Sequence, residues 1–486
     1  MRAAKHILIL FLLSCCLPLM AWDWWPLPMA QPDTCRDSLF YVGEFSMVTS
    51  SGLQSPSLLH NNTNGNIAIQ PHSGNLSIGI IKPATRPSRW FDYDFGVILT
   101  GRVQGEQQFA YEQPRATATG YFREAYAHVR LYIIDVTAGI KPEVYGSQDP
   151  VFSSGGFLYS GNTQPIPRIT VGIDNYTPIP GLFGYLEFKG GLTHGWFVDY
   201  LKPSPDAPEA TTGTLLHHLH ASLRAGGKLP VNLSYSFHHA AQWGGVSPIY
   251  GAFKEDFKTW VNICKAGAGG SSLNDQLNAE GNHIGFQEWC LWFNYGGWEA
   301  RAYWQTIFED KSAKFIGFGN ITDGLWGIHI HQHNWPFINA FTYEYLNTTA
   351  QDGPYHDKDG LTYGGNDTYF YNTAYRQGWT HFGRTIGNPL ISVDNNRVRN
   401  HFVALGGDIY GYKYRIAACF TKNWGTYKTP LYSENKALLI EVRKHFEKAW
   451  GLDFGLSLGA DFGDQYGTSV GAMFTISKRG LIIDYK

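Results

Sequence analysis

The stretch LDFGLSLGADF, residues 452–462, alternates strictly between apolar side chains and small or acidic ones. Successive side chains of a strand point to opposite sides, so Leu456 and Leu458 share one face while Ser457 and Gly459 share the other. A soluble sandwich carries Lys and Glu on its polar face, whereas this polar face holds Gly, Ser and Asp. The pattern is typical of a strand with lipid on one side and a wet lumen on the other, and it predicts an outer-membrane β-barrel.

The same alternation recurs along most of the chain. In residues 91–99, aromatic and aliphatic side chains interleave with Asp92, Asp94 and Gly96. Tilted strands of this length can cross a bilayer, and their number predicts a closed antiparallel barrel of about 16–18 strands. The predicted strands are 39–47, 76–81, 91–103, 121–131, 133–140, 169–173, 182–189, 215–223, 231–238, 288–293, 299–307, 325–331, 338–346, 401–409, 412–420, 436–445, 452–462 and 468–476, and residues 481–485 continue the alternation.

The composition agrees with an all-β transmembrane barrel. Charged residues are 16% of the 486 and aromatic residues 15%, which suits the aromatic girdles of such a barrel. No Pro/Ser-rich linker or charged run divides the chain, so we expect one barrel domain over residues 22–486. With 38 basic and 40 acidic residues the net charge is −2, and no basic surface points to nucleic acid.

The first residues have the pattern of an export signal. Arg2 and Lys5 precede an apolar run at 7–13, and a small-residue cleavage site ends at Ala21. We therefore predict a signal peptide over residues 1–21 and a mature chain in the outer membrane. The alternative is a lipoprotein signal in which Cys15 is acylated. Beyond the signal no run of about 18 apolar residues is present, which excludes helical membrane spans.

One segment departs from the period of two. Phe253, Phe257, Trp260 and Cys264 fall on one face of a helix, and Ser272 suits the start of a second helix. We predict a small helical plug or cap over about residues 251–283. The alternative is a helical loop packed on the barrel rim.

Four cysteines remain in the mature chain, in a compartment that permits oxidation. Three pairings are possible, and the sequence does not choose among them. Cys419 lies within a strand-like run, where it fits a small packed residue better than a disulfide. The four are Cys35, Cys264, Cys290 and Cys419.

The best candidate for ligand binding is the irregular segment 364–379. Sugars present C–H patches and dense hydroxyls, so their sites combine aromatic faces with amide and charged partners. This segment supplies both, and the alternative is a loop packed inside the lumen. Glu344 is predicted to point into the lumen, where a carboxylate can hold a loop or bind a sugar hydroxyl. The candidates are Asn366, Tyr369, Tyr371, Tyr375, Arg376, Trp379 and Glu344.

Motifs for catalysis or metal binding are weak. Asp92 and Asp94 share a strand face about 6–7 Å apart, near the separation of an inverting glycosidase pair, but lumenal carboxylates often have that spacing without catalysing a reaction. His329 and His331 share a face, whereas His333 is predicted to lie out of reach, and no third ligand follows at a suitable spacing. We therefore predict no enzyme activity, no metal and no cofactor.

Four longer stretches resemble the capsule assembly Wzi family: YSGNTQPIP at 159–167, FHHAAQWGG at 237–245, YEYLNTTAQDGP at 343–354 and GWTHFGRTIGNPL at 378–390. The resemblance implies an outer-membrane barrel of about eighteen strands, partly closed by helices at the periplasmic end. It also implies a non-enzymatic lectin that binds capsular or surface polysaccharide and anchors it at the cell surface. We expect a monomer in outer-membrane lipid, inserted by the barrel assembly machinery.

Two other functions stay open at this point. The barrel alone would suit a diffusion channel, which needs a clear lumen. A secreted glycan hydrolase is the weaker alternative, because the acid pair is poorly supported and the alternation is that of a lipid-facing strand.

Overall fold

The computed structural model describes residues 37–85, 90–105, 118–199, 209–267, 269, 279–309, 322–351, 357–358, 361–362, 368–464 and 467–485. The predicted signal peptide lies outside these residues, and so do Cys15, Cys35 and Asn366.

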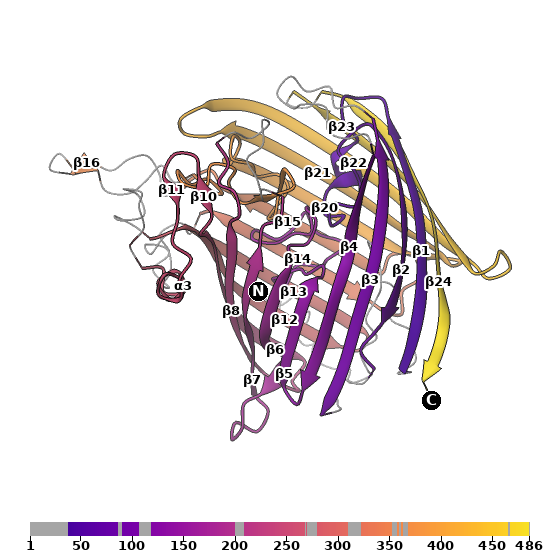
Figure 1. The fold of residues 1–486 in the computed structure, drawn as a ribbon. Helices are drawn as coiled ribbons and strands as arrows, with labels where there is room; N and C mark the ends of the chain where they lie inside the picture. The colour runs from indigo at the N-terminus through magenta and orange to yellow at the C-terminus, as the bar shows by residue number, and fades with distance from the viewer. Residues whose placement is uncertain are drawn as a thin grey trace, which may run out of the picture.

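The described residues form a closed antiparallel β-barrel of 18 strands, as predicted (Figure 1). Strand β1 pairs with β2 and with β24, so the sheet closes on itself and has no free edge. The barrel strands are β1 (Asp37–Ser50), β2 (His72–Lys82), β3 (Phe91–Gln104), β4 (Ala118–Leu131), β5 (Ile134–Ile140), β6 (Arg168–Pro178), β7 (Leu186–Trp196), β8 (Leu215–Ala225), β9 (Val231–Trp243), β12 (Asn282–Tyr295), β13 (Trp298–Phe308), β14 (Gly324–Gln332), β15 (Ala340–Asn347), β20 (Val398–Ile409), β21 (Tyr412–Gly425), β22 (Pro430–Phe446), β23 (Leu452–Gly463) and β24 (Ser469–Tyr485).

Smaller elements lie in the connections between barrel strands. Among the described residues, two-residue strands form three hairpins, and there are two short helices. These elements are β10 (Val246–Ser247), β11 (Gly251–Ala252), β16 (Asp357–Lys358), β17 (Leu361–Thr362), β18 (Thr380–His381), β19 (Arg384–Thr385), α2 (Ser57–His60) and α3 (Phe257–Cys264).

Every predicted strand corresponds to a strand of the barrel, although the boundaries move. The largest shift is at β7, which was expected at 182–189 and lies at Leu186–Trp196. Gly181, Phe183 and Gly184 have positive φ, a conformation of tight turns and not of strands. This stretch therefore forms the turn before β7.

The outer face of the barrel is apolar and the inner face is polar. On β23, Leu456 and Leu458 are each 50% exposed and point outward, whereas Ser457 and Asp461 are buried and point inward. A belt of exposed apolar side chains around a closed sheet is suited to contact with lipid hydrocarbon. Among the described residues, no helix is long and apolar enough to cross a membrane.

The connections differ between the two ends of the barrel. Short turns, such as residues 132–133, 296–297 and 410–411, join strands at the end where β1 begins and β24 finishes. Long connections, which carry both helices, lie at the opposite end (Figure 1). Because outer-membrane barrels have short periplasmic turns and long extracellular loops, we assign the short-turn end to the periplasm and the long-loop end to the exterior.

Irregular chain fills much of the lumen. We call the segments 51–71, 141–167 and 368–397 the plug. Phe157, Leu158 and Trp379 of the plug pack with Leu216 and Phe286, which point inward from β8 and β12, in one buried cluster. The lumen is therefore packed with side chains on the β8–β15 side.

The first of the two predicted helices forms as α3, but not inside the lumen; Ser272, the predicted start of the second, lies outside the described residues. Its buried Ile263 packs against Ala241 and Trp243, which lie on the outward face of β9. The Cys264 Sγ lies 3.6 Å from Nδ1 of His217, which points outward from β8. The helix α3 thus covers the outside of the barrel near the long-loop end, as in the rim alternative. The plug is formed instead by mostly irregular chain, which includes α2 and the β18–β19 hairpin.

Candidate functional site

Carboxylates on the barrel wall hold the plug in place. Glu344 of β15 is fully buried and accepts hydrogen bonds from the Ser153 hydroxyl (2.6 Å), the Ser154 amide (2.7 Å) and the Ser154 hydroxyl (2.6 Å). The Tyr303 hydroxyl donates a fourth, at 2.5 Å. Of the two roles considered for Glu344, the structure shows the loop-holding one, because its oxygens are occupied by the plug and the wall.

A second wall carboxylate accepts hydrogen bonds from a serine nearer the start of the 141–167 segment. Glu288 of β12 accepts hydrogen bonds from the Ser147 amide at 2.9 Å and from the Ser147 hydroxyl at 2.6 Å. On the opposite wall, Asp461 of β23 accepts from the amide and hydroxyl of Ser57, at 2.7 and 3.0 Å, at the start of α2. The plug is therefore tied to both sides of the barrel.

Between the plug and strands β21–β23 the lumen stays open as a cavity of about 330 Å³. This volume is at the lower end of the range for small-molecule pockets. Gly467, in the β23–β24 connection, is exposed and lines the cavity, so the cavity reaches the surface at the long-loop end. Its lining is polar and rich in amides: Gln54, Asn61, Asn162, Asn395, Asn423 and Asn435.

One of these amides is buried with an unused acceptor. Asn162 is 6% exposed, and its Nδ2 donates to the Thr385 carbonyl at 3.0 Å. Its Oδ1 makes no hydrogen bond within the described part of the chain. A buried carbonyl without a partner costs about 1–3 kcal/mol.

The charged groups of the cavity are arranged around α2. The Arg384 Nη1 donates to the carbonyl of Asn162 at 3.2 Å, which places the guanidinium on the plug side. Burial, together with the charge of Arg384, lowers the pKa of His60 to about 3. His60 is therefore neutral near pH 7, and its Nδ1 lies 2.9 Å from the Ser55 hydroxyl.

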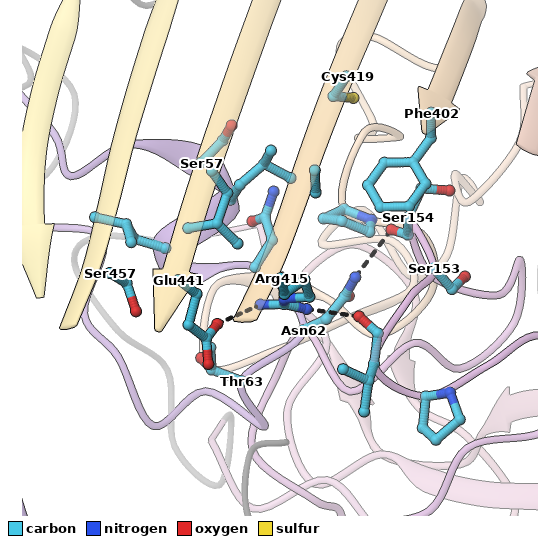
Figure 2. A pocket seen from close by; sticks show the side chains of 18 of the residues that line it. Ser57, Asn62, Thr63, Ser153, Ser154, Phe402, Arg415, Cys419, Glu441 and Ser457 are labelled. Atoms are coloured by element: carbon cyan, nitrogen blue, oxygen red, sulfur yellow. Dashed lines mark hydrogen bonds and ion pairs between the residues drawn. The ribbon is translucent and has the colours of Figure 1, made fainter. Parts of the chain in front are cut away.

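A smaller chamber of about 40 Å³ adjoins this cavity and shares Ser57, Asn61 and Cys419 with it (Figure 2). The Arg415 side chain lines this chamber. Its Nη2 lies 2.9 Å from Glu441 Oε2, and its Nη1 donates to the Val151 carbonyl at 2.5 Å. The ion pair joins neighbouring strands β21 and β22, and the second bond ties them to the plug. The chamber is too small for a sugar ring and marks where the open cavity ends.

The structure places most of the predicted aromatic site inside the plug. Tyr369 and Trp379 are completely buried and Tyr375 is 2% exposed. The Trp379 indole donates to the Leu158 carbonyl at 2.9 Å, and the Tyr369 hydroxyl donates to Asp323 at the same distance. Their ring faces contact protein, so this conformation does not bring them together as an open sugar-binding surface.

Two other predicted residues remain accessible at the long-loop end. Tyr371 is half-buried, and Arg376 forms an exposed ion pair with Glu209 at 2.5 Å. The amides that line the cavity were not among the site residues predicted from the sequence. The sequence did hold one signal for this cavity: Asn162 and Arg384 lie in two of the four stretches that carry the family resemblance, 159–167 and 378–390.

The two aspartates weighed as a catalytic pair are engaged in the barrel wall. Asp92 accepts from the Thr85 amide at 2.9 Å, whereas Asp94 pairs with His128 and lies 3.5 Å from Lys141. These contacts give the two carboxylates structural partners, and the pair shows no shared open site.

The described cysteines form no disulfide with one another. Cys419 is 4% exposed and its Sγ donates to Asn400 Oδ1 at 2.9 Å, so it is a packed wall residue as predicted. The other two are Cys264 and Cys290.

Comparison with known proteins gives the fold. No family model and no curated protein sequence matches the chain. The structure is similar to Wzi of Escherichia coli, described as an outer membrane protein involved in group 1 capsule assembly and a carbohydrate-binding β-barrel, with a TM-score of 0.58 and 15% identity over 91% of this chain and 84% of that one. Two Pseudomonas aeruginosa proteins also align, OccK5 (OpdH) at TM-score 0.45 and OccK7 (OpdD) at 0.47, each with 10% identity over 92% of this chain and 98% and 99% of theirs. The similarity to Wzi shows the fold, which is an outer-membrane type of β-barrel.

Proposed function

We propose that this protein is an outer-membrane barrel that binds a capsular or surface polysaccharide at its long-loop end and helps to anchor it there, without enzymatic activity. The observation that carries the proposal is the amide-lined cavity of about 330 Å³ at the long-loop end. Amides both donate and accept hydrogen bonds, which suits sugar hydroxyls. The family resemblance of the sequence and the structural likeness to a carbohydrate-binding barrel support the same function.

A polymer can extend beyond the cavity across the long-loop end. Tyr371 and Arg376 are the accessible members of the predicted site, and we propose them as further contacts for such a chain. A repeating polymer engages many copies of the protein at once, so weak binding at each copy gives firm retention at the surface.

The packing of the plug bears on the alternative of a diffusion channel. Side chains fill the lumen on the β8–β15 side, and Arg415 narrows the remaining space below the cavity. Both features favour binding over passage of solutes. Single-channel recording, discussed below, separates the two functions.

The proposed location predicts how the protein fractionates. The mature chain should begin at Trp22, sediment with outer membranes, resist carbonate extraction and change mobility on heating in detergent, because a closed barrel unfolds slowly. N-terminal sequencing and membrane fractionation measure these properties. Recovery in a soluble periplasmic fraction would contradict the proposal.

The binding proposal predicts a loss of affinity when the cavity amides are removed. The double variant Asn61→Ala/Asn162→Ala should bind the host's purified capsular polysaccharide about tenfold more weakly, because two hydrogen bonds of about 0.5–1.5 kcal/mol each are lost. Asn232→Ala, at the start of β9 and at the short-turn end, is the matched control and should bind like the wild type. Affinity is measured by calorimetry on folded protein, and surface-retained capsule is compared with total capsule on cells.

Equal affinity of the double variant and the wild type would show that the cavity is not the site. Failure of the wild type to bind the polymer, together with normal capsule retention in a deletion strain, would overturn the proposed function as a whole.

A further inference from the structure

The barrel carries a cluster of metal-ligating side chains at its short-turn end, far along the strands from the cavity. Glu299 of β13 and His331 of β14 are direct cross-strand partners, and both point inward. Partners of this kind on one face have Cβ atoms about 4.5–5.5 Å apart. The strand register therefore brings a carboxylate beside an imidazole.

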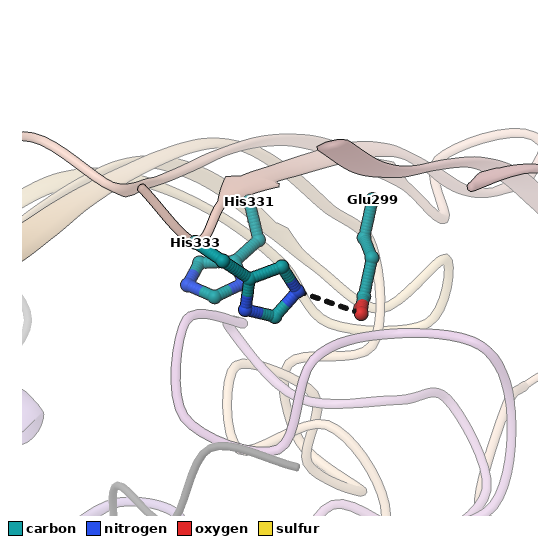
Figure 3. Close-up of side chains that lie close together, drawn as sticks. All are labelled: Glu299, His331 and His333. Carbon is teal, nitrogen blue, oxygen red and sulfur yellow. Dashed lines mark hydrogen bonds and ion pairs between the residues drawn. The ribbon is translucent and has the colours of Figure 1, made fainter. Parts of the chain in front are cut away.

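The turn after β14 adds a second imidazole. The His333 amide donates to the Gly297 carbonyl at 3.0 Å, and the Asn334 amide donates to Gln332 Oε1 at 2.6 Å. These bonds fold the turn back over the strand end, so the His333 ring lies 4.3 Å from the His331 ring, at 82°. The His333 Nε2 also lies 2.8 Å from Glu299 Oε1 (Figure 3).

We propose that Glu299, His331 and His333 form a binding site for one divalent transition-metal ion, with Zn²⁺ as the ion that best suits two imidazoles and one carboxylate. One ligand atom from each residue lies within 4.8 Å of the other two. A tetrahedral Zn²⁺ holds N and O ligands at about 2.0–2.2 Å, which places ligand atoms about 3.3 Å apart. Small side-chain rotations are enough to reach that geometry.

The surroundings favour a cation at this cluster. Arg301, the next inward residue on β13, is paired with Asp149 at 3.1 Å and does not neutralise Glu299. His329, the partner first considered for His331, lies 2.8 Å from the Thr342 hydroxyl instead. The side chains of His333 and Glu299 are 25% and 31% exposed, so an ion can reach them from the periplasmic mouth.

A second acidic and histidine cluster provides a contrast. His128, Asp135 and Asp174 also lie within ligand distance of one another. The Arg130 Nε, however, lies 2.7 Å from Asp135 and already supplies positive charge there. That cluster is an ion-pair network, and an added metal ion would be repelled by Arg130.

A bound ion would link the start of β13, which carries Glu299, to the end of β14 and the β14–β15 turn, which carry His331 and His333. The test uses the full mature chain without a polyhistidine tag, purified in detergent, stripped with a chelator and titrated with ZnCl₂ by calorimetry. We expect one saturable site. His333→Ala and Glu299→Gln should each weaken it at least about tenfold, and His331→Ala/His333→Ala should abolish it.

His445→Ala is the matched control, because His445 and Asp453 form an exposed histidine–carboxylate pair at the same end without a second histidine. It should leave zinc affinity unchanged. Heat-dependent mobility confirms that each variant is folded, and Co²⁺ should give visible absorption bands in the wild type that the double variant lacks. Equal zinc binding by the wild type and the double variant, an equal loss in His445→Ala, or no saturable binding by the wild type would each overturn the proposal.

Discussion

Replacing Glu344 with alanine is expected to release the 141–167 part of the plug and to destabilise the folded barrel by about 3–5 kcal/mol. The substitution leaves the Ser154 amide and the hydroxyls of Ser153, Ser154 and Tyr303 without their acceptor in a buried site. Glu344→Gln keeps the shape but turns an amide donor toward these donors, so an intermediate loss is expected. The temperature at which heating changes the mobility of the barrel in detergent measures the effect.

Glu434→Ala is the control for this prediction. Glu434 forms an exposed ion pair with Lys422 at 3.0 Å, and surface pairs contribute little to stability. Its transition temperature should match that of the wild type. A Glu344→Ala barrel that is as stable as the Glu434→Ala barrel would mean that the plug does not depend on its wall carboxylates.

Replacing Trp379 with alanine is expected to turn a silent barrel into a conducting one. The buried indole packs edge-on against Tyr159 and Phe197, with ring centroids 5.9 and 6.2 Å away, and joins the two larger plug segments. Its removal leaves a cavity that costs about 3–5 kcal/mol, enough for part of the plug to open. Planar-bilayer recordings should show little current for the wild type and frequent openings for the variant.

Two controls separate the plug from other causes of leakage. Trp450→Ala removes a tryptophan that is 82% exposed and should stay silent. Deletion of α3 (Phe257–Cys264) should also stay silent, because this helix lies on the outside of the barrel. Currents that appear on deletion of α3 and not with Trp379→Ala would mean that the helix closes the lumen after all, and large wild-type currents would favour the channel.

The barrel itself could be predicted from the sequence because its signal is local. Each strand repeats every two residues, and the lipid-facing side chains of β23 and β3 show that period without reference to any other part of the chain. The existence of α3 was predictable for the same reason, because the spacing of apolar residues on one face of a helix is visible within about a dozen residues. The surface on which α3 packs was not, because the outward Ala241 and Trp243 belong to another strand.

The candidate site also separates what the local sequence predicts from what only the tertiary structure decides. Tyr369 and Trp379 are the residue types that bind sugars, and they are also the types that fill cores, so only their neighbours in space decide between exposure and burial. Strand spacing predicts that His333 lies out of reach of His331. The turn in which the His333 amide donates to the Gly297 carbonyl brings the His333 ring to the proposed metal site instead.

The sequence by itself determined the closed barrel, a strand number of about 16–18, its lipid-facing side and the inward direction of Glu344, because these follow from a period carried by consecutive residues. Tertiary structure decided what fills the lumen, where α3 packs, which amides line the remaining cavity and which carboxylate meets His331. These contacts join residues that are distant along the chain, and their geometry is set by strand register and turn conformation, which no local pattern records.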